Sequence, residues 1–230
     1  MQLLLLPGLH GTSDLFGPFI RALPPSLDTL PLSYPEREHL TIPSLALFVS
    51  EYIPSNQPFV LLAESFSGAV ALTLASKGAP YLRGILLCGS LVRHPHPVLA
   101  RCCNPLLIRL TPDAFLLHRL AGAYVTDDLR SLCGDLMSRL SPAVLSARLK
   151  EILRFDALPL IAHCPVPVHY IRPSRDKVIP KGQVGLLEEH CPHVPVTVVP
   201  GPHLLLQTNP AAAAEVVLEF LSGLTGVRPA

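Results

Sequence analysis

The chain has 230 residues, of which 49% are hydrophobic and only 15% are charged. This length suits one domain with a large core, or one domain that carries an insertion. The apolar composition favours a buried parallel sheet with helices on both faces. The formal net charge of +1 gives no overall electrostatic argument for binding nucleic acid or a membrane surface.

The N-terminal stretch MQLLLLPGLHG contains a run of four leucines. A signal peptide needs a basic segment before a longer apolar stretch, and a membrane helix needs about 20 apolar residues. We therefore expect neither. The six cysteines have no framework spacing and no CxxC pair, which is typical of thiols in a reducing compartment. These features predict a cytoplasmic protein without a membrane segment.

Short apolar runs alternate with helical patterns along the chain, and this rhythm predicts a parallel sheet built from βα units. Six strands are expected, joined by right-handed crossovers: Gln2–Leu6, Thr29–Tyr34, Phe59–Ala63, Leu82–Cys88, Val166–Ile171 and Pro195–Val199. The helices expected between and after them are Leu15–Ala22, Ile42–Tyr52, Phe66–Lys77, Gly182–His190 and Pro210–Leu221.

Residues 92–154 interrupt this rhythm, because they contain no convincing strand and are typical of four or five short helices. The segments TDD and SPAV are typical helix N-caps. A helical insertion between two strands of a parallel sheet would form a lid over the carboxyl ends of the strands, where ligands bind in such folds. The sequence therefore predicts a core of residues 1–91 and 155–230, and a lid of residues 92–154.

The stretch FVLLAESFSGAVAL predicts a buried strand that ends at a serine and continues into a helix of small residues. A nucleophile elbow holds its serine in such a turn, and the residues two before and two after the serine must be small because the two backbones nearly touch. With Ser65 as the nucleophile these positions are Ala63 and Ser67, and Gly68 then allows close packing. The register with Ser67 as the nucleophile places a bulky valine there instead. We predict Ser65 as the nucleophile, with two alternatives: Ser67, or a Ser65 that only caps the helix.

A serine hydroxyl needs a histidine base and an orienting carboxylate before it can attack. The segment VPVHYIRPSRDKVIP predicts a strand followed by a turn that carries Asp176, and VPVTVVPGPHLLLQTNP predicts a strand followed by a loop that carries His203. Both residues would then lie at the same sheet edge as Ser65, in the chain order serine, acid, histidine. We predict Ser65, Asp176 and His203 as the catalytic residues. Taken singly, the aspartate and the histidine are also typical of an ordinary turn and loop.

Other acids and histidines fit this arrangement less well. Asp156 precedes the approach to a strand, and Glu64 is expected on the other side of the turn from Ser65. No other histidine lies in a loop after the final strand, and the histidines form no metal-ligand pattern on one helix face. We therefore expect no metal and no cofactor.

Acyl transfer also needs backbone N–H donors for the oxyanion that forms at the reacting carbonyl. One donor is the amide of the residue after the nucleophile, here Phe66. The second is expected from the loop after the first strand, in LLLLPGLHGTSDLF.

Four segments together resemble the α/β-hydrolase superfamily, and the resemblance extends over nearly the whole chain: LLLLPGLHGTSDLF, LLAESFSGAVAL, IRPSRDKVIP and VPGPHLLLQTNP. The resemblance implies that the second oxyanion donor follows a His-Gly pair. Pro7 and Gly8 occupy that position here, which makes Leu9 the donor, whereas the pair His10 and Gly11, three residues later, would make Thr12 the donor.

The chain departs from the superfamily pattern in two respects. Ala63 and Ser67 replace both glycines of the G-x-S-x-G motif, which affects the subgroup rather than the mechanism. The first strand also corresponds to the third of the usual eight. We therefore expect a minimal α/β-hydrolase fold, with about six mainly parallel strands, flanking helices and a helical lid after the fourth strand.

Within the superfamily, the small size, the helical lid and the GTSDLF segment are similar to the compact carboxylesterases, a group that includes the pimeloyl-carrier-protein methyl esterase. The resemblance suggests that a basic lid docks an acyl carrier protein or a carboxylate-bearing substrate; the alternative is that its arginines only cover solvated helix faces. The lid arginines are Arg93, Arg101, Arg109, Arg119, Arg130, Arg139, Arg148 and Arg154.

The function that these features favour is cleavage of a carboxylic ester through an acyl-enzyme. A thioesterase, an acyltransferase and a cofactor-free perhydrolase would use the same triad, and a non-catalytic ligand-binding protein would use only the fold. Apolar lid residues suggest a hydrophobic pocket for the acyl or alcohol part of a small ester, although at helical spacing they are also typical of packing: Leu106, Leu107, Ile108, Phe115, Leu116 and Leu117.

Overall fold

The computed structural model describes residues 1–37, 40–93 and 104–225. Six parallel strands form one sheet in the order β2-β1-β3-β4-β5-β6. The strands are β1 (Gln2–Leu6), β2 (Thr29–Pro31), β3 (Phe59–Glu64), β4 (Leu82–Cys88), β5 (Val168–Pro173) and β6 (Val196–Val199). This sheet confirms the predicted minimal α/β-hydrolase fold with six strands.

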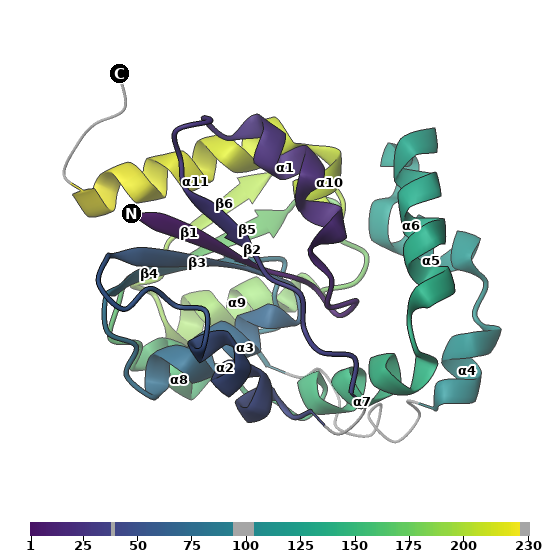
Figure 1. The fold of residues 1–230 in the computed structure, drawn as a ribbon, viewed down its shortest axis with the longest axis horizontal. Helices are drawn as coiled ribbons and strands as arrows, with labels where there is room; N and C mark the ends of the chain where they lie inside the picture. Colours follow the sequence, from purple (N-terminus) through teal and green to yellow (C-terminus); the bar gives the residue numbers. More distant parts are fainter. Residues whose placement is uncertain (38–39, 94–103, 226–230) are drawn as a thin grey trace.

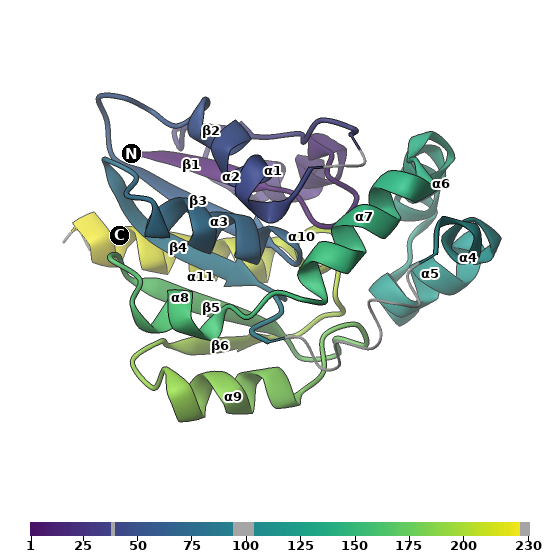
Figure 2. The ribbon, with the colours of Figure 1, turned by 90° about the horizontal axis from the view of Figure 1, so that it is seen from below.

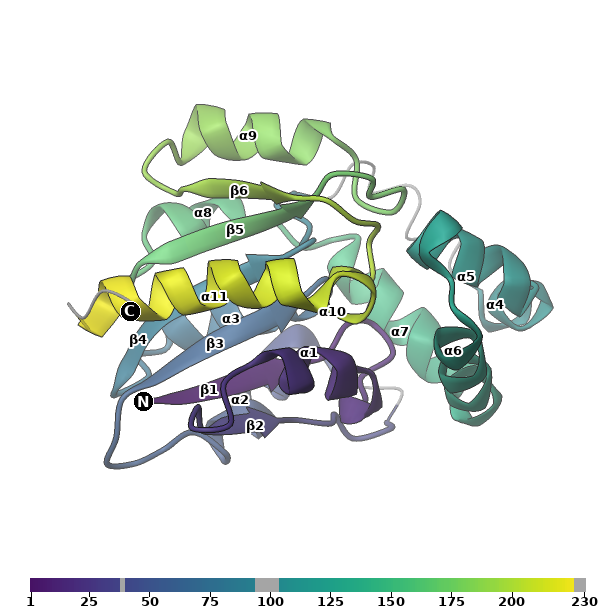
Figure 3. The same cartoon turned by 90° about the horizontal axis from the view of Figure 1, so that it is seen from above.

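Helices cover both faces of the sheet (Figures 1 and 3). One face is covered by α2 (Ile42–Ser50), α3 (Ser67–Ser76), α8 (Leu158–Ala162) and α9 (Gly182–His190). The other face is covered by α1 (Gly17–Ala22), α10 (Leu205–Thr208) and α11 (Pro210–Thr225), and the 3-10 helix η1 (Ser13–Phe16) leads into α1.

Strand alternation explains why the protein has two separate cores. On β1, Leu4 and Leu6 pack in the cluster beneath α2 and α3, whereas Leu3 and Leu5 pack in the cluster beneath α1 and α11. Successive side chains of a strand point to opposite faces. A strand that is buried on both faces is therefore an unbroken apolar run, as the four leucines of β1 are.

Strand ends differ from the sequence prediction where the backbone hydrogen bonds leave the sheet. The second strand was expected to reach Tyr34 but ends at Pro31, and the Tyr34 amide donates instead to the Gly11 carbonyl at 2.7 Å. The fifth strand was expected from Val166 but begins at Val168, directly after Pro167. Proline has no N–H to donate to a strand ladder.

The helix predictions hold with shifts of a few residues, except for two short helices. α8 and α10 were not expected as separate elements. Each contains only four or five residues, and α8 has Pro159 in its first turn. Segments this short have too few residues to show a helical period.

In the described chain, the first elements after β4 are α4 (Pro105–Leu110), α5 (Asp113–Ala121), η3 (Gly122–Tyr124), α6 (Asp127–Arg139) and α7 (Pro142–Ile152), and α8 of the core follows them before β5. We call α4 to α7 the helical insertion. The Thr126 and Ser141 side chains accept hydrogen bonds from the first turns of α6 and α7, as expected for N-caps. The insertion lies beyond the carboxyl ends of the strands (Figures 1 and 2).

The two ends of the helical insertion meet at the edge of the core. Arg93 and Asp156 form an antiparallel backbone bridge, and their side chains form an ion pair with a 3.0 Å separation. The Ala157 amide also donates to the Val92 carbonyl at 2.8 Å. Within the described ranges, no helix is both long enough and apolar enough to span a bilayer.

Candidate active site

Ser65 occupies the turn between β3 and α3 in a conformation that is uncommon for a residue with a side chain. Its φ angle is +51°, and the only other non-glycine residue with positive φ in the described part of the chain is Tyr81. Its amide donates to the Cys88 carbonyl at 2.8 Å, which ties the turn to the end of β4. Backbone strain of this kind is typical of a nucleophile elbow, because it lifts the serine side chain clear of the sheet.

Asp176 and His203 reach this serine from the loops after β5 and β6. The His203 Nε2 atom lies 3.0 Å from the Ser65 Oγ atom, and its Nδ1 atom lies 2.7 Å from the Asp176 Oδ2 atom. Because ionised Asp176 can only accept, Nδ1 carries the proton and Nε2 is left to accept from the serine hydroxyl. The structure thus brings together the three residues that the sequence singled out.

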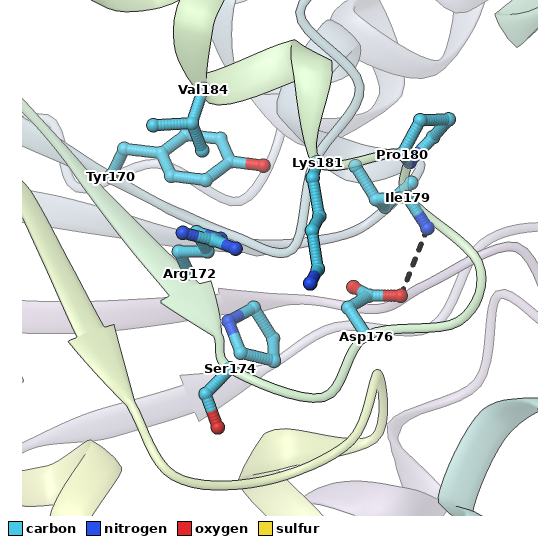
Figure 4. A pocket seen from close by; sticks show the side chains of 9 residues that line it. Tyr170, Arg172, Ser174, Asp176, Ile179, Pro180, Lys181 and Val184 are labelled. Atoms are coloured by element: carbon cyan, nitrogen blue, oxygen red, sulfur yellow. Dashed lines mark hydrogen bonds between the residues drawn. The ribbon is translucent and has the colours of Figure 1, made fainter.

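The Asp176 carboxylate is held from two sides. Its second oxygen accepts hydrogen bonds from the amides of Val178 at 2.7 Å and Ile179 at 2.9 Å, and Figure 4 shows the Ile179 bond. The side chains of Asp176 and His203 are each only 6% exposed. These contacts fix the carboxylate so that it can hold one ring orientation and one tautomer of the histidine.

Ser67, the alternative nucleophile, lies on the other side of the turn. It is fully buried, its hydroxyl donates to the Pro7 carbonyl, and it accepts from the Tyr34 hydroxyl. Burial raises the pKa of Tyr34, so that the phenol keeps the proton that it donates. Ser67 therefore joins α3 to the loop after β1, whereas His203 is hydrogen-bonded to Ser65.

Gly68 has the packing role that its position predicts. A Cβ atom on this glycine would lie 2.6 Å from the Ser90 Oγ atom and 2.7 Å from the Ser90 Cβ atom, closer than van der Waals contact allows. The start of α3 thus passes against the chain that follows β4, where only glycine fits.

The loop after β1 has its carbonyl groups turned toward the protein. The Pro7 carbonyl accepts from Ser67, the Gly8 carbonyl from the Gly11 amide at 3.0 Å, and the Gly11 carbonyl from Tyr34. The remaining two carbonyls, of Leu9 and His10, accept from the Arg148 guanidinium at 3.0 and 2.9 Å.

The amides predicted for the oxyanion hole are not used inside the protein. Across the described ranges, neither the Leu9 amide nor the Phe66 amide donates a hydrogen bond to another protein group. The Thr12 amide, the alternative donor, is already bonded to the His10 Nδ1 atom at 3.2 Å. This difference favours Leu9 over Thr12 as the second donor.

Arg148 is a site feature that sequence analysis missed, because it was counted among the surface arginines. It lies on α7 of the helical insertion, is 2% exposed, and also donates to the Pro35 carbonyl at 3.2 Å. Its guanidinium lies 5.7 Å from the centre of the Tyr34 ring, a cation–π contact. Burial lowers its pKa, but an arginine remains charged at neutral pH. Gly11 has φ +77°, and a Cβ atom there would lie 2.1 Å from this guanidinium.

The sequence holds a signal for this buried arginine. Val144, Arg148 and Ile152 are spaced by four residues, so they share one face of α7, and the two apolar members of this set are buried. An arginine in the middle of an apolar stripe of a helix is therefore expected to be buried and not exposed to solvent.

The other arginines of the predicted lid divide into paired and exposed groups. Arg93 pairs with Asp156, and Arg139 pairs with Asp14 at 2.9 Å. Arg101 lies outside the described residues, as do His94 and His96. In the described chain, four are exposed without an ion pair: Arg109, Arg119, Arg130 and Arg154.

The apolar residues expected to line a pocket lie in different environments rather than around one cavity. Leu106, Leu107 and Phe115 are 59%, 56% and 58% exposed, whereas Leu117 is buried against Leu204 of the core. Ile108 packs in a further cluster, with residues of η1, α6 and α7. The helical insertion therefore covers the loops after β1 and β6 with some of its apolar side chains and exposes others.

A buried polar group lies beneath the loop after β1. Glu64 is 2% exposed, accepts from Gln207 at 3.1 Å, and has its other oxygen 3.7 Å from the His10 Nε2 atom. Because the Thr12 amide donates to His10 Nδ1, a neutral His10 carries its proton on Nε2, facing Glu64. Glu64 thus faces His10 and not His203, in agreement with its predicted place on the other side of the turn from Ser65.

The described residues also include side chains of the types that ligate metals, and free thiols. No group of three or more His, Cys, Asp or Glu side chains in residues 1–37, 40–93 and 104–225 is arranged to hold a metal ion. Four cysteines have free thiols in these ranges, and Cys102 and Cys103 lie outside them. Burial raises the pKa of the Cys88 thiol well above its usual value, and the nearby Glu64 and Asp176 charges add to this effect.

A six-stranded parallel sheet with a strained serine between a strand and a helix is the arrangement of the α/β-hydrolase fold. The model of the alpha/beta hydrolase family matches residues 3–216, so the chain belongs to this family. Membership supports a hydrolytic enzyme. A sequence comparison with curated proteins gave no match.

Solved structures show the same fold at low sequence identity. An esterase from Exiguobacterium antarcticum has a TM-score of 0.82 at 12% identity, over 96% of this chain and 92% of that one. A thermophilic esterase from Thermogutta terrifontis has a TM-score of 0.80 at 17% identity, over 97% and 90%. A bromoperoxidase from Bacillus anthracis has a TM-score of 0.78 at 16% identity, over 96% and 91%.

Proposed function

We propose that this protein is a serine hydrolase that cleaves carboxylic esters through an acyl-enzyme. The observation that carries the proposal is the chain of hydrogen bonds from Asp176 through His203 to Ser65, at 2.7 and 3.0 Å, with the serine held at φ +51°. Geometry and residue roles identify such a triad, whatever the sequence around it.

In the first half of the reaction, Ser65 Oγ attacks the ester carbonyl carbon while His203 Nε2 takes the hydroxyl proton. The tetrahedral oxyanion accepts hydrogen bonds from the Leu9 and Phe66 amides. Asp176 stabilises the imidazolium that forms and does not itself take the proton. The bond to the leaving alcohol then breaks, and His203 returns the proton to that alcohol.

In the second half, His203 removes a proton from water, and the resulting hydroxide attacks the acyl carbonyl of Ser65. The second oxyanion uses the same two amides. Collapse of this intermediate releases the carboxylic acid, and Ser65 regains its proton from His203. In this proposal the helical insertion acts as a lid that limits the access of water to the site.

The proposal is tested with a chain-length series of p-nitrophenyl esters and a matching series of acyl thioesters. The wild type is expected to hydrolyse esters, and Ser65→Ala to lower kcat by about 10⁴-fold or more. Ser67→Ala is the matched control and keeps turnover. Activity that survives in Ser65→Ala and is lost in Ser67→Ala would assign the reaction to Ser67, and faster turnover of thioesters would indicate a thioesterase.

Docking of an acyl carrier protein on the insertion stays a separate proposal. Of the arginines that suggested it, Arg109 and Arg130 are exposed and unpaired, whereas Arg148 is committed to the loop after β1. Charge reversal at Arg109 and Arg130 is expected to raise KM for a carrier-protein ester and to leave KM for a small ester unchanged. Equal KM values before and after the change would remove the docking proposal.

A further inference from the structure

A hollow of about 160 Å³ lies where the helical insertion meets the two loops that carry Asp176 and His203. One wall is the end of α5 together with η3. The other wall consists of the residues next to Asp176 and His203 in sequence. The two walls are joined directly, because the Leu204 amide donates to the Leu120 carbonyl at 3.1 Å. The residues that face it with side-chain functional groups are Arg119, Tyr124, Arg175 and Lys177.

Three of these side chains are cations, and no carboxylate is among the described residues that line the hollow. Within the described part of the chain, Arg119, Arg175 and Lys177 form no ion pair. Arg175 and Lys177 flank Asp176 in the chain. In the fold they come together with Arg119, which is more than 50 residues earlier in the chain.

Each cation is held by a contact of its own. The Arg119 guanidinium donates to the Lys177 carbonyl. The Arg175 guanidinium lies 5.7 Å from the centre of the Tyr124 ring, and the Lys177 ammonium donates to the His118 Nε2 atom at 3.3 Å. None of these partners neutralises a positive charge.

Three like charges in one small hollow repel one another, and a bound anion would relieve that repulsion. Guanidinium groups bind carboxylates through charge-assisted hydrogen bonds, which are stronger than neutral ones. The position beside Pro202 places such an anion next to the loop of His203. The anion would then belong to the molecule that reacts at Ser65.

We propose that this hollow binds a carboxylate of the substrate, away from the bond that is cleaved. The inference rests on the proposed ester hydrolysis and names its substrate class: an ester that keeps a free carboxylate, such as a monoester of a dicarboxylic acid. Binding energy from a remote group of this kind positions the reacting carbonyl.

The test compares mono-p-nitrophenyl glutarate with p-nitrophenyl pentanoate, a neutral ester of the same acyl length. We expect the wild type to have the higher kcat/KM for the glutarate ester. The double variant Arg119→Gln/Lys177→Gln is expected to lower that preference about tenfold, as loss of a charge-assisted contact would. Its kcat/KM for the pentanoate ester should not change, because the catalytic residues are untouched.

Arg154→Gln is the matched control, since Arg154 is an exposed arginine just beyond α7 and outside the hollow. An unchanged preference in the double variant, or the same loss with Arg154→Gln, would overturn the proposal. If the wild type cleaves neither ester, the proposed function fails. Calorimetric binding of glutarate to Ser65→Ala, with and without the double change, then decides the anion site separately: equal binding overturns it.

Discussion

Ser65 and Ser67 are two residues apart, yet the turn after β3 sends them to opposite sides. Ser65 faces His203 and Ser67 faces the Pro7 carbonyl and Tyr34. The sequence could separate their positions because the turn needs small neighbours, and only one register supplies them. It could not identify the partners of Ser67, because Pro7 and Tyr34 are distant in the chain and come together only in the fold.

Ser67→Ala is expected to lower the free energy of unfolding and to keep the nucleophile. Removal of the hydroxyl leaves the buried Tyr34 phenol and the Pro7 carbonyl without a partner, which costs about 1–3 kcal/mol. Urea denaturation measures this loss, and labelling by a fluorophosphonate measures the reactivity of Ser65. Ser76→Ala, at an exposed position of the same helix, should change neither. Loss of labelling in Ser67→Ala would contradict its structural role.

Arg148 connects the helical insertion to the loop after β1, and we predict that it positions the Leu9 amide. Arg148→Ala should lower kcat for a small ester about tenfold or more, because two loop carbonyls lose their donor and the Leu9 amide loses its fixed direction. KM should change much less. The measurement is steady-state kinetics with and without added guanidinium chloride at low concentration.

Chemical rescue separates positioning from general stability. Guanidinium ion should restore part of kcat in Arg148→Ala, because it can occupy the place of the lost side chain, and should not affect Arg154→Ala, which removes an exposed arginine just beyond α7. A KM effect without a kcat effect, or no rescue in a folded variant, would contradict the positioning role.

At the scale of the elements, apolar runs and helical periods in the sequence predicted the strands and the long helices. They did not predict where these elements end. β2 ends early because the Tyr34 amide bonds to Gly11, and β5 begins late because Pro167 cannot donate. Such ends depend on which backbone groups meet across the fold. Propensity along the chain carries no information about those partners.

The close approach of α3 to the chain after β4 gives a prediction about Gly68. Gly68→Ala is expected to lower the free energy of unfolding by about 1–3 kcal/mol, because its methyl group would clash with Ser90. Ser90→Gly in the same chain removes both clashing atoms and should recover most of that loss. A thermal or urea double-mutant cycle gives the coupling between the two positions. Additive effects would show that the contact does not limit packing.

At the scale of the whole molecule, the sequence predicted the sheet edge at which the site forms, because Ser65, Asp176 and His203 each follow a strand. It did not predict how the helical insertion contributes. Arg148 and Arg119 were grouped by composition, but the fold sends one into the core and the other to a hollow beside His203. Only the placement of α5 and α7 against the core separates these two arginines.

The pH dependence of stability depends in part on His169, which bridges β5 and β6. Its Nε2 atom lies 2.8 Å from the Thr197 hydroxyl, and burial lowers its pKa below the usual 6.5, although Glu219 opposes the shift. The folded state therefore binds fewer protons than the unfolded state near pH 6.5 and just below. Stability should fall as pH drops through about 6.5, and this contribution should level off below the folded pKa.

Urea denaturation of the wild type and of His169→Gln between pH 5 and 8 measures this contribution. The glutamine variant should have a flatter curve in that range, because it has no ring to protonate. His163→Gln is the control, since it replaces an exposed histidine that lies outside the sheet. Parallel curves for the wild type and His169→Gln would contradict the assignment.

The bridge between Arg93 and Asp156 has a consequence for protein engineering. Because the two ends of the insertion meet at one backbone pair, a segment from another member of the family could be grafted there without changing the spacing of β4 and β5. Such a chimera would lack Arg148, which donates hydrogen bonds to the loop after β1. The sheet would still fold, but the Leu9 and His10 carbonyls would have lost their donor. A working graft must therefore bring its own cation to the Leu9 and His10 carbonyls.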